Sequence, residues 1–84
     1  VLESQLFPNP AQDQVKIKFS LPNHGEVSLT LWDMQGRHIR SIYQRQLARG
    51  TYQIPVDIQA LATGAYFVQV AFLDKVQVLK LIKD

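Results

Sequence analysis

The chain has 84 residues and no cysteine, and its nine Lys and Arg against seven Asp and Glu give a net charge of +2. This length suits one small domain, and the lack of cysteine excludes disulfides and thiolate metal sites. The charge is too small and too dispersed to favour a nucleic-acid partner. No apolar run approaches the roughly 18 residues of a transmembrane segment. Because the first residue is Val1, we expect a fragment of a longer polypeptide.

Two prolines flank Asn9 near the start of the chain. Pro8 and Pro10 fix their own φ angles, bias the preceding residues toward extended conformations and cannot donate backbone hydrogen bonds. We therefore expect a rigid segment where a flexible tether, residues 1–5, gives way to a domain spanning residues 6–84. Phe7 should pack against the end of that domain.

Alternation of apolar and polar residues predicts strands over residues 15–21, 27–32, 37–43 and 52–58. Ile39 should point inward, and Pro55 favours an edge position for the fourth of these strands. Residues 65–72 are apolar on both faces, as in a central strand. The final strand spans residues 76–83, with a bulge expected near Val78, where the alternation slips. Short strands joined by turns predict an all-β, immunoglobulin-like antiparallel sandwich of about seven strands.

One spacing favours this fold further. In "LATGAYFVQV", Leu61, Gly64 and Tyr66 have the spacing of a tyrosine corner, in which a tyrosine hydroxyl binds the backbone of the preceding loop. The alternation also predicts a core. Its members are Val15, Ile17, Phe19, Leu29, Leu31, Ile54, Val56, Leu61, Tyr66, Val68 and Val70.

Residues that carry chemistry are sparse. His24 and His38 lack an obvious third metal ligand, and no glycine-rich phosphate loop or nucleophile elbow is present. The carboxylates fall mostly at turns or strand ends, where they cap backbone N–H groups. We therefore expect no catalytic residue, no metal, no cofactor and no enzyme activity. Trp32 and Tyr43 leave open a carbohydrate- or protein-binding module, and a structural spacer is a further alternative.

Four segments, in order along the chain, resemble the C-terminal sorting domain of type IX secretion cargo, type A class, from the Bacteroidetes. They are an aromatic residue with P-N-P, a D-x-x-G-[KR] turn, an L-x-x-G-x-Y segment and a K-L-[IV]-K strand. The matching positions are Phe7, Pro8, Asn9 and Pro10, then Asp33, Gly36 and Arg37, then Leu61, Gly64 and Tyr66, and finally Lys80, Leu81, Ile82 and Lys83.

This resemblance implies a secretion signal at the C-terminus of a cargo protein. Its partners would be the upstream cargo domains, an outer-membrane translocon and a surface sortase that removes the domain. The cargo would cross the periplasm and reach the cell surface or the medium. We expect the translocon to recognise the last strand. Leu81 or Ile82 would anchor this strand in the core, while Lys80 and Lys83 would present charge at its rim.

Overall fold

The predicted alternation corresponds to a fold built of strands in the computed structural model, which describes residues 3–84. Within that range the protein is all-β and contains no helix. The strands are β1 (Glu3–Phe7), β2 (Gln14–Leu21), β3 (Gly25–Asp33), β4 (His38–Leu47), β5 (Gly50–Asp57), β6 (Gly64–Phe72) and β7 (Lys75–Lys83).

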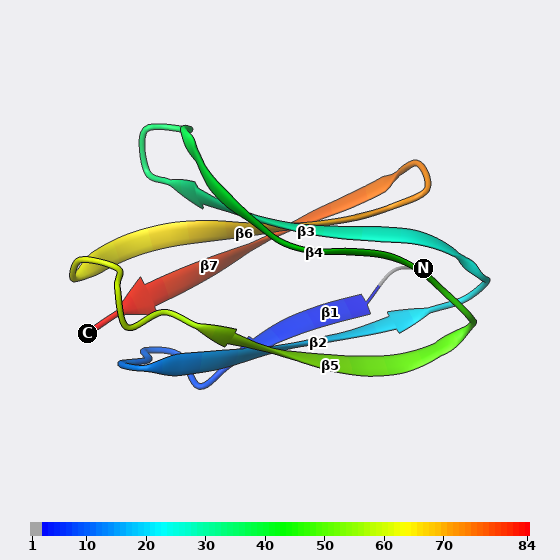
Figure 1. The fold of residues 1–84 in the computed structure, drawn as a ribbon, viewed down its shortest axis with the longest axis horizontal. Coiled ribbons are helices and arrows are strands. Elements are labelled where there is room, and N and C mark those ends of the chain that lie inside the picture. Colours follow the sequence, from blue (N-terminus) through cyan, green and yellow to red (C-terminus); the bar gives the residue numbers. More distant parts are fainter. Residues whose placement is uncertain (1–2) are drawn as a thin grey trace.

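The strands form two sheets that stack as the layers of a sandwich (Figure 1). One sheet has the order β1-β2-β5, the other β4-β3-β6-β7, and every pair is antiparallel. β5, which contains Pro55, lies at an edge, and β6 lies between two strands. The predicted sandwich, the edge position and the central strand are all confirmed.

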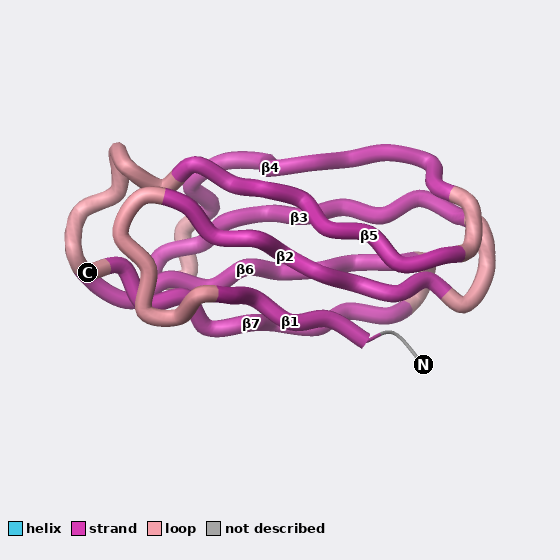
Figure 2. The backbone as a smooth tube through the Cα atoms, turned by 90° about the horizontal axis from the view of Figure 1, so that it is seen from below, coloured by secondary structure: helices cyan, strands magenta, loops and turns pink. Residues whose placement is uncertain are grey.

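The seven strands are joined in two ways. Three connections are hairpins within one sheet, namely β1–β2, β3–β4 and β6–β7. The other three, β2–β3, β4–β5 and β5–β6, cross from one sheet to the other. The edge strands β1 and β7 lie on the same side of the sandwich, where the Ser4 hydroxyl donates to the Gln77 side-chain oxygen (Figure 2).

The core lies between the sheets because alternate residues of each strand face inward. Eight of the predicted core residues are buried, while Ile54, Leu61 and Tyr66 are half-buried and pack against that core. Each large aliphatic or aromatic side chain removed from water contributes about 1.5–3 kcal/mol. The buried apolar residues are Ala11, Val15, Ile17, Phe19, Leu21, Val27, Leu29, Leu31, Val56, Ile58, Val68, Val70, Phe72 and Leu81.

Local predictions failed in two strands. Ile39 is 38% exposed, so the prediction that it points inward is wrong; Ile42 packs against the core instead. The reason is that the β3–β4 pairing shifts register twice, between Leu29 and Thr30 and again beyond Leu31. By contrast, β6 and β7 pair without a shift, so the bulge expected near Val78 is absent.

The start of the chain also differs from the expectation. Residues 3–5 of the expected tether belong to strand β1 (Glu3–Phe7), which pairs with β2 along its whole length. Residues 1 and 2 of the expected tether lie outside the described residues. The prolines follow β1 directly, so they end a strand rather than precede the first one.

Candidate functional site

The four sequence segments, which are spread over the whole chain, meet at one end of the sandwich. In Figure 1 the β1–β2 loop, the β3–β4 turn, the β5–β6 connection and the C-terminus all lie at the left, opposite the β2–β3 and β4–β5 connections. We call this region the motif end and define it as residues 8–13, 33–37, 58–66 and 80–84. The strand pairing explains this convergence because β3 and β7 end where β6 begins.

Three of the segments are direct neighbours in the four-stranded sheet. Asp33 on β3 lies opposite Tyr66 on β6, and Tyr66 lies opposite Leu81 on β7. One row across the sheet thus contains a residue from the D-x-x-G-[KR], L-x-x-G-x-Y and K-L-[IV]-K segments. Gly64 and Lys83 form a second cross-strand pair between two of the same segments.

The fourth segment, P-N-P, closes the outer edge of β7 beside this row. The Asn9 side chain donates from Nδ2 to the Lys80 carbonyl and accepts at Oδ1 from the Ile82 N–H, both at 2.9 Å. Two residues on, the Ala11 N–H donates to the Ile82 carbonyl at 2.9 Å, and its carbonyl accepts from the Asp84 N–H at 2.8 Å. The Asn9 amide therefore occupies the place of a strand residue, and we call residues 9–12 the clasp.

The four residues assigned to recognition play different parts in this geometry. Leu81 is fully buried, as expected of an anchor, while Ile82 is half-buried and Lys80 is exposed. Lys83 is only 8% exposed, and its ammonium donates to the Gln12 carbonyl in the clasp. The expectation that Lys83 presents charge at the rim is therefore wrong; of the two lysines, Lys80 alone does so.

The Asp33 turn is held by its carboxylate. Asp33 Oδ1 accepts from the backbone N–H groups of Gln35 and Arg37, and Oδ2 accepts from Arg37 Nε, all at 2.9 Å. The bond from the Arg37 N–H is the largest cause that lowers the Asp33 pKa; the guanidinium and the Gln35 N–H add to it, and partial burial opposes it. Gly36 has φ of +84°, which suits glycine at this tight turn.

The predicted tyrosine corner is confirmed. The Tyr66 hydroxyl donates to the Ala62 carbonyl at 2.7 Å, and Gly64 has φ of +153°. The same arrangement occurs at the opposite end, where the Tyr52 hydroxyl donates to the Ala48 carbonyl at 2.7 Å.

Sequence reasoning missed this second corner. Its signal was present, because the pattern L-A-x-G-x-Y occurs at residues 47–52 and again at residues 61–66.

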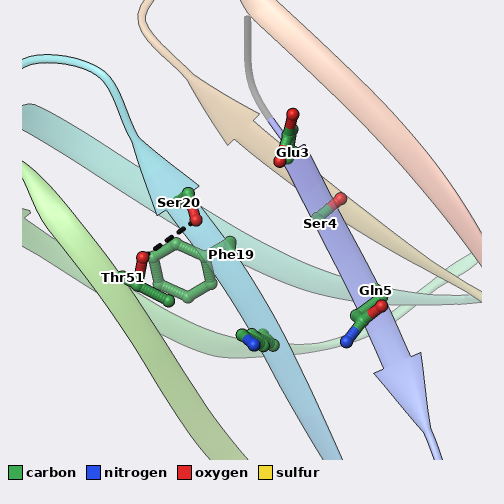
Figure 3. Close-up of a pocket in the computed structure, with 7 residues that line it drawn as sticks. Glu3, Ser4, Gln5, Phe19, Ser20 and Thr51 are labelled. Atoms are coloured by element: carbon green, nitrogen blue, oxygen red, sulfur yellow. Dashed lines mark hydrogen bonds between the residues drawn. The ribbon is translucent and has the colours of Figure 1, made fainter.

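Two surface hollows lie on different parts of the domain. One, of about 490 Å³, lies at the motif end between the Asp33 turn and the β5–β6 connection. The other, of about 370 Å³, lies on the three-stranded sheet, where the Ser20 and Thr51 hydroxyls are 3.0 Å apart and hydrogen-bonded (Figure 3). Within residues 3–84, no group of three His, Asp or Glu side chains is placed to bind a metal ion. The same residues contain no helix able to cross a membrane.

The two candidate sugar-binding aromatics do not form a strip. The Trp32 indole N–H donates to Thr30 Oγ1 at 2.9 Å, and its ring meets His38 edge to face at 5.2 Å. Tyr43 instead packs against the core. Trp32 and Tyr43 therefore do not together form the strip of exposed aromatic rings that a carbohydrate-binding surface would need.

Comparison with known proteins identifies the arrangement. Residues 5–84 match the secretion system C-terminal sorting domain. A search of curated proteins found no match. The family match spans nearly the whole chain, including all four segments that meet at the motif end. This chain therefore belongs to the family of secretion system C-terminal sorting domains, which are sorting signals for type IX secretion and direct export toward the cell surface or the medium.

Proposed function

We propose that this domain carries cargo attached upstream across the outer membrane through the type IX translocon. The cargo passes through the periplasm, and a surface sortase then removes the domain. In this proposal residues 1–5 belong to the connection with the cargo, although residues 3–5 also complete the three-stranded sheet. The sortase therefore meets a connection that joins a folded edge strand rather than a free tether.

We further propose that the translocon recognises the motif end. The observation that supports this is the single row Asp33–Tyr66–Leu81, closed at its edge by the Asn9 side chain. Segments that are 71 residues apart, at Asn9 and Lys80, are held in contact by hydrogen bonds with fixed geometry. A receptor that binds there reads all four segments at once, and only on a completely folded domain.

Within this surface the residues have separate roles. Lys80 supplies the exposed charge beside the exposed Pro8, Asn9 and Pro10. The buried Leu81 side chain anchors β7 in the core, and the Lys83 ammonium holds the clasp by donating to the Gln12 carbonyl. Lys80 is therefore the residue that we expect to contact the translocon, while Leu81 and Lys83 position it.

The test is export of a reporter. Residues 1–84 are fused behind a periplasmic reporter in a host with a type IX system, and the reporter is followed in periplasm, outer membrane and medium. Deleting residues 80–84 would remove the buried Leu81 and unfold part of the core. The informative variant is therefore Lys80→Glu, with Arg49→Glu, an exposed charge reversal at the opposite end, as its control.

We expect the wild-type and Arg49→Glu fusions to be exported and lose the domain, and Lys80→Glu to accumulate in the periplasm. Retention of the wild-type fusion in such a host would refute the sorting function for this chain. Export of Lys80→Glu at the wild-type level would refute recognition at the motif end but not the sorting function itself.

A further inference from the structure

The sandwich has four edge strands, and most of their exposed length is protected against pairing with another chain. β1 has only five residues, β5 contains Pro55, and the pairing of β4 is irregular. Short strands, prolines and bulges are the usual means by which proteins prevent edge-to-edge association. Among residues 3–84, the clasp is the segment that binds the outer backbone edge of β7, and it reaches only as far as Lys80. Ser4 of β1 contacts β7 through the Gln77 side chain instead.

The remaining stretch of β7 is open at Val76 and Val78. Backbone groups of a strand alternate in direction, and the clasp binds Lys80 and Ile82, so the N–H and C=O groups of Val76 and Val78 also face outward. Within residues 3–84, no backbone bond outside the strand ladders reaches them. Their side chains, 55% and 60% exposed, are apolar, where a protected edge would carry charge.

A hollow of about 260 Å³ adjoins this open stretch. Val78 forms one wall, and Trp32, Met34 and Phe67 contribute most of the apolar lining from β3, the β3–β4 turn and β6. Trp32 and Phe67 are cross-strand neighbours. Because the Trp32 indole N–H is already bonded to Thr30, the hollow presents ring surface rather than hydrogen-bond donors. It suits an aliphatic or aromatic side chain.

Building on the proposed function, we propose that this open edge receives an extended segment of the sorting machinery. The segment adds a strand to the four-stranded sheet, pairs its backbone with Val76 and Val78, and places an apolar side chain in the hollow. Addition of a strand to an exposed edge is a general mode of peptide recognition, in which main-chain bonds give affinity and side-chain pockets give specificity. Lys75 and Lys80 border the stretch, so a carboxylate on the segment would complement it.

A second copy of this chain fits the edge less well. Two β7 strands paired in antiparallel fashion over the open stretch would bring Lys75 of each copy near Lys80 of the other, where like charges repel. An extended segment from another protein can end before it reaches Asn9, so it can use the whole open stretch.

Val78→Pro tests the edge because it removes one outward N–H without touching the β6–β7 ladder. Gln53→Pro is the matched control. It lies two residues before Pro55 on β5, so by the same alternation its N–H also faces outward, but from the other sheet. Val78→Lys is the second variant, since it keeps the backbone and puts a charge beside the hollow. Thermal unfolding of each variant establishes that it is folded before export of the reporter fusion is measured.

We expect both Val78 variants to lower the exported fraction by about tenfold. Val78→Pro loses one hydrogen bond, which is worth about that factor in affinity. Val78→Lys keeps that bond but puts a charge against the apolar hollow. Gln53→Pro should be exported like the wild type. If Val78→Pro fails to fold, Val78→Lys decides alone. Export of the folded Val78 variants at the wild-type level would overturn the inference while the wild-type fusion still supports the sorting function. The inference would also be overturned if the wild type sediments as a dimer and Val78→Lys sediments as a monomer. That result would assign the edge to a second copy of this chain.

Discussion

The two tyrosine corners lie at opposite ends of the sandwich and share a local geometry, but their neighbours differ. In each, a tyrosine hydroxyl donates to the carbonyl four residues earlier at 2.7 Å, and the intervening glycine has φ of +153°. Tyr52 lies opposite Phe19, and their rings stack with centroids 5.7 Å apart. Tyr66 lies opposite Asp33 on one side and Leu81 on the other.

The shared geometry shows what the corner itself does. Both corners lie where the chain leaves one sheet and enters the other, at the β4–β5 and β5–β6 connections. A hydroxyl that binds the incoming backbone fixes the angle of such a crossing. The corner is therefore a structural device, and the motif end differs from the other end through its charged turn and its clasp.

The largest effect is expected from the corner glycines. Replacing Gly50 or Gly64 by valine should lower the free energy of unfolding by about 1–3 kcal/mol in each case, because φ of +153° is readily adopted only by glycine. Space is not the cause: a Cβ on Gly64 meets nothing within 4 Å, and one on Gly50 meets the Tyr52 ring at 3.7 Å. Urea unfolding measures both, with the exposed Thr63→Val as control. If only one of the two glycine variants is less stable than the wild type, the two corners are not structurally equivalent.

A smaller effect is expected at the clasp, which only the motif end contains. Asn9→Ala removes two hydrogen bonds to exposed strand groups and should cost about 1–2 kcal/mol. Hydrogen exchange of the Ile82 amide should accelerate, because its N–H then faces water. Asn23→Ala, in the exposed turn after β2, is the control. An Ile82 amide that exchanges at the wild-type rate in Asn9→Ala would show that the clasp does not hold in solution.

How well the sequence predicts a structural feature depends on how far apart along the chain the interacting residues are. Alternation revealed β2, β3, β5 and β7 because each has one inward face that repeats every second residue, whereas β6 was predicted from a run that is apolar on both faces. It failed for Ile39 because a register shift reverses the faces of a strand without changing its composition. It missed β1 because five residues with only two adjacent apolar positions show no period.

The sequence predicted which residues belong to the candidate site but not how they are arranged. The corner could be derived from Gly64 and Tyr66 because its bond spans four residues. The clasp could not, since the Asn9 amide and Ile82 are 73 residues apart in the chain and are brought together by the tertiary fold. The same holds for Lys83: its position at the end of a terminal strand suggests exposure, and its burial follows from the loop that folds over it.

The corner hydroxyls give a third, smaller test. Tyr52→Phe and Tyr66→Phe each remove one hydrogen bond and should each cost about 0.5–1.5 kcal/mol in urea unfolding. Because the corner is structural, both folded variants should still export the reporter. Loss of export in Tyr66→Phe but not in the equally stable Tyr52→Phe would show that the translocon reads this hydroxyl directly.

The smallest effect, and the one that depends on pH, is expected at the Asp33 turn. Its pKa is lowered in the folded state, first by the Arg37 N–H, so its ionised form stabilises the fold. That contribution is complete above the unfolded pKa of about 3.9 and is lost as the pH falls through the lower folded pKa. Asp33→Asn should therefore be less stable than the wild type near neutral pH, and the difference should shrink in acid.

Free energies of unfolding measured between neutral and acid pH test this, with Arg37→Gln as the comparison. That variant loses the guanidinium but keeps the backbone N–H that is the largest cause of the shift, so part of the pH dependence should remain. Because Tyr52 has Phe19 where Tyr66 has Asp33, Tyr52→Phe should show no comparable change. If the difference in free energy of unfolding between the wild type and Asp33→Asn stays constant with pH, the Asp33 charge does not stabilise the turn. The charged turn would then not distinguish the motif end from the opposite end.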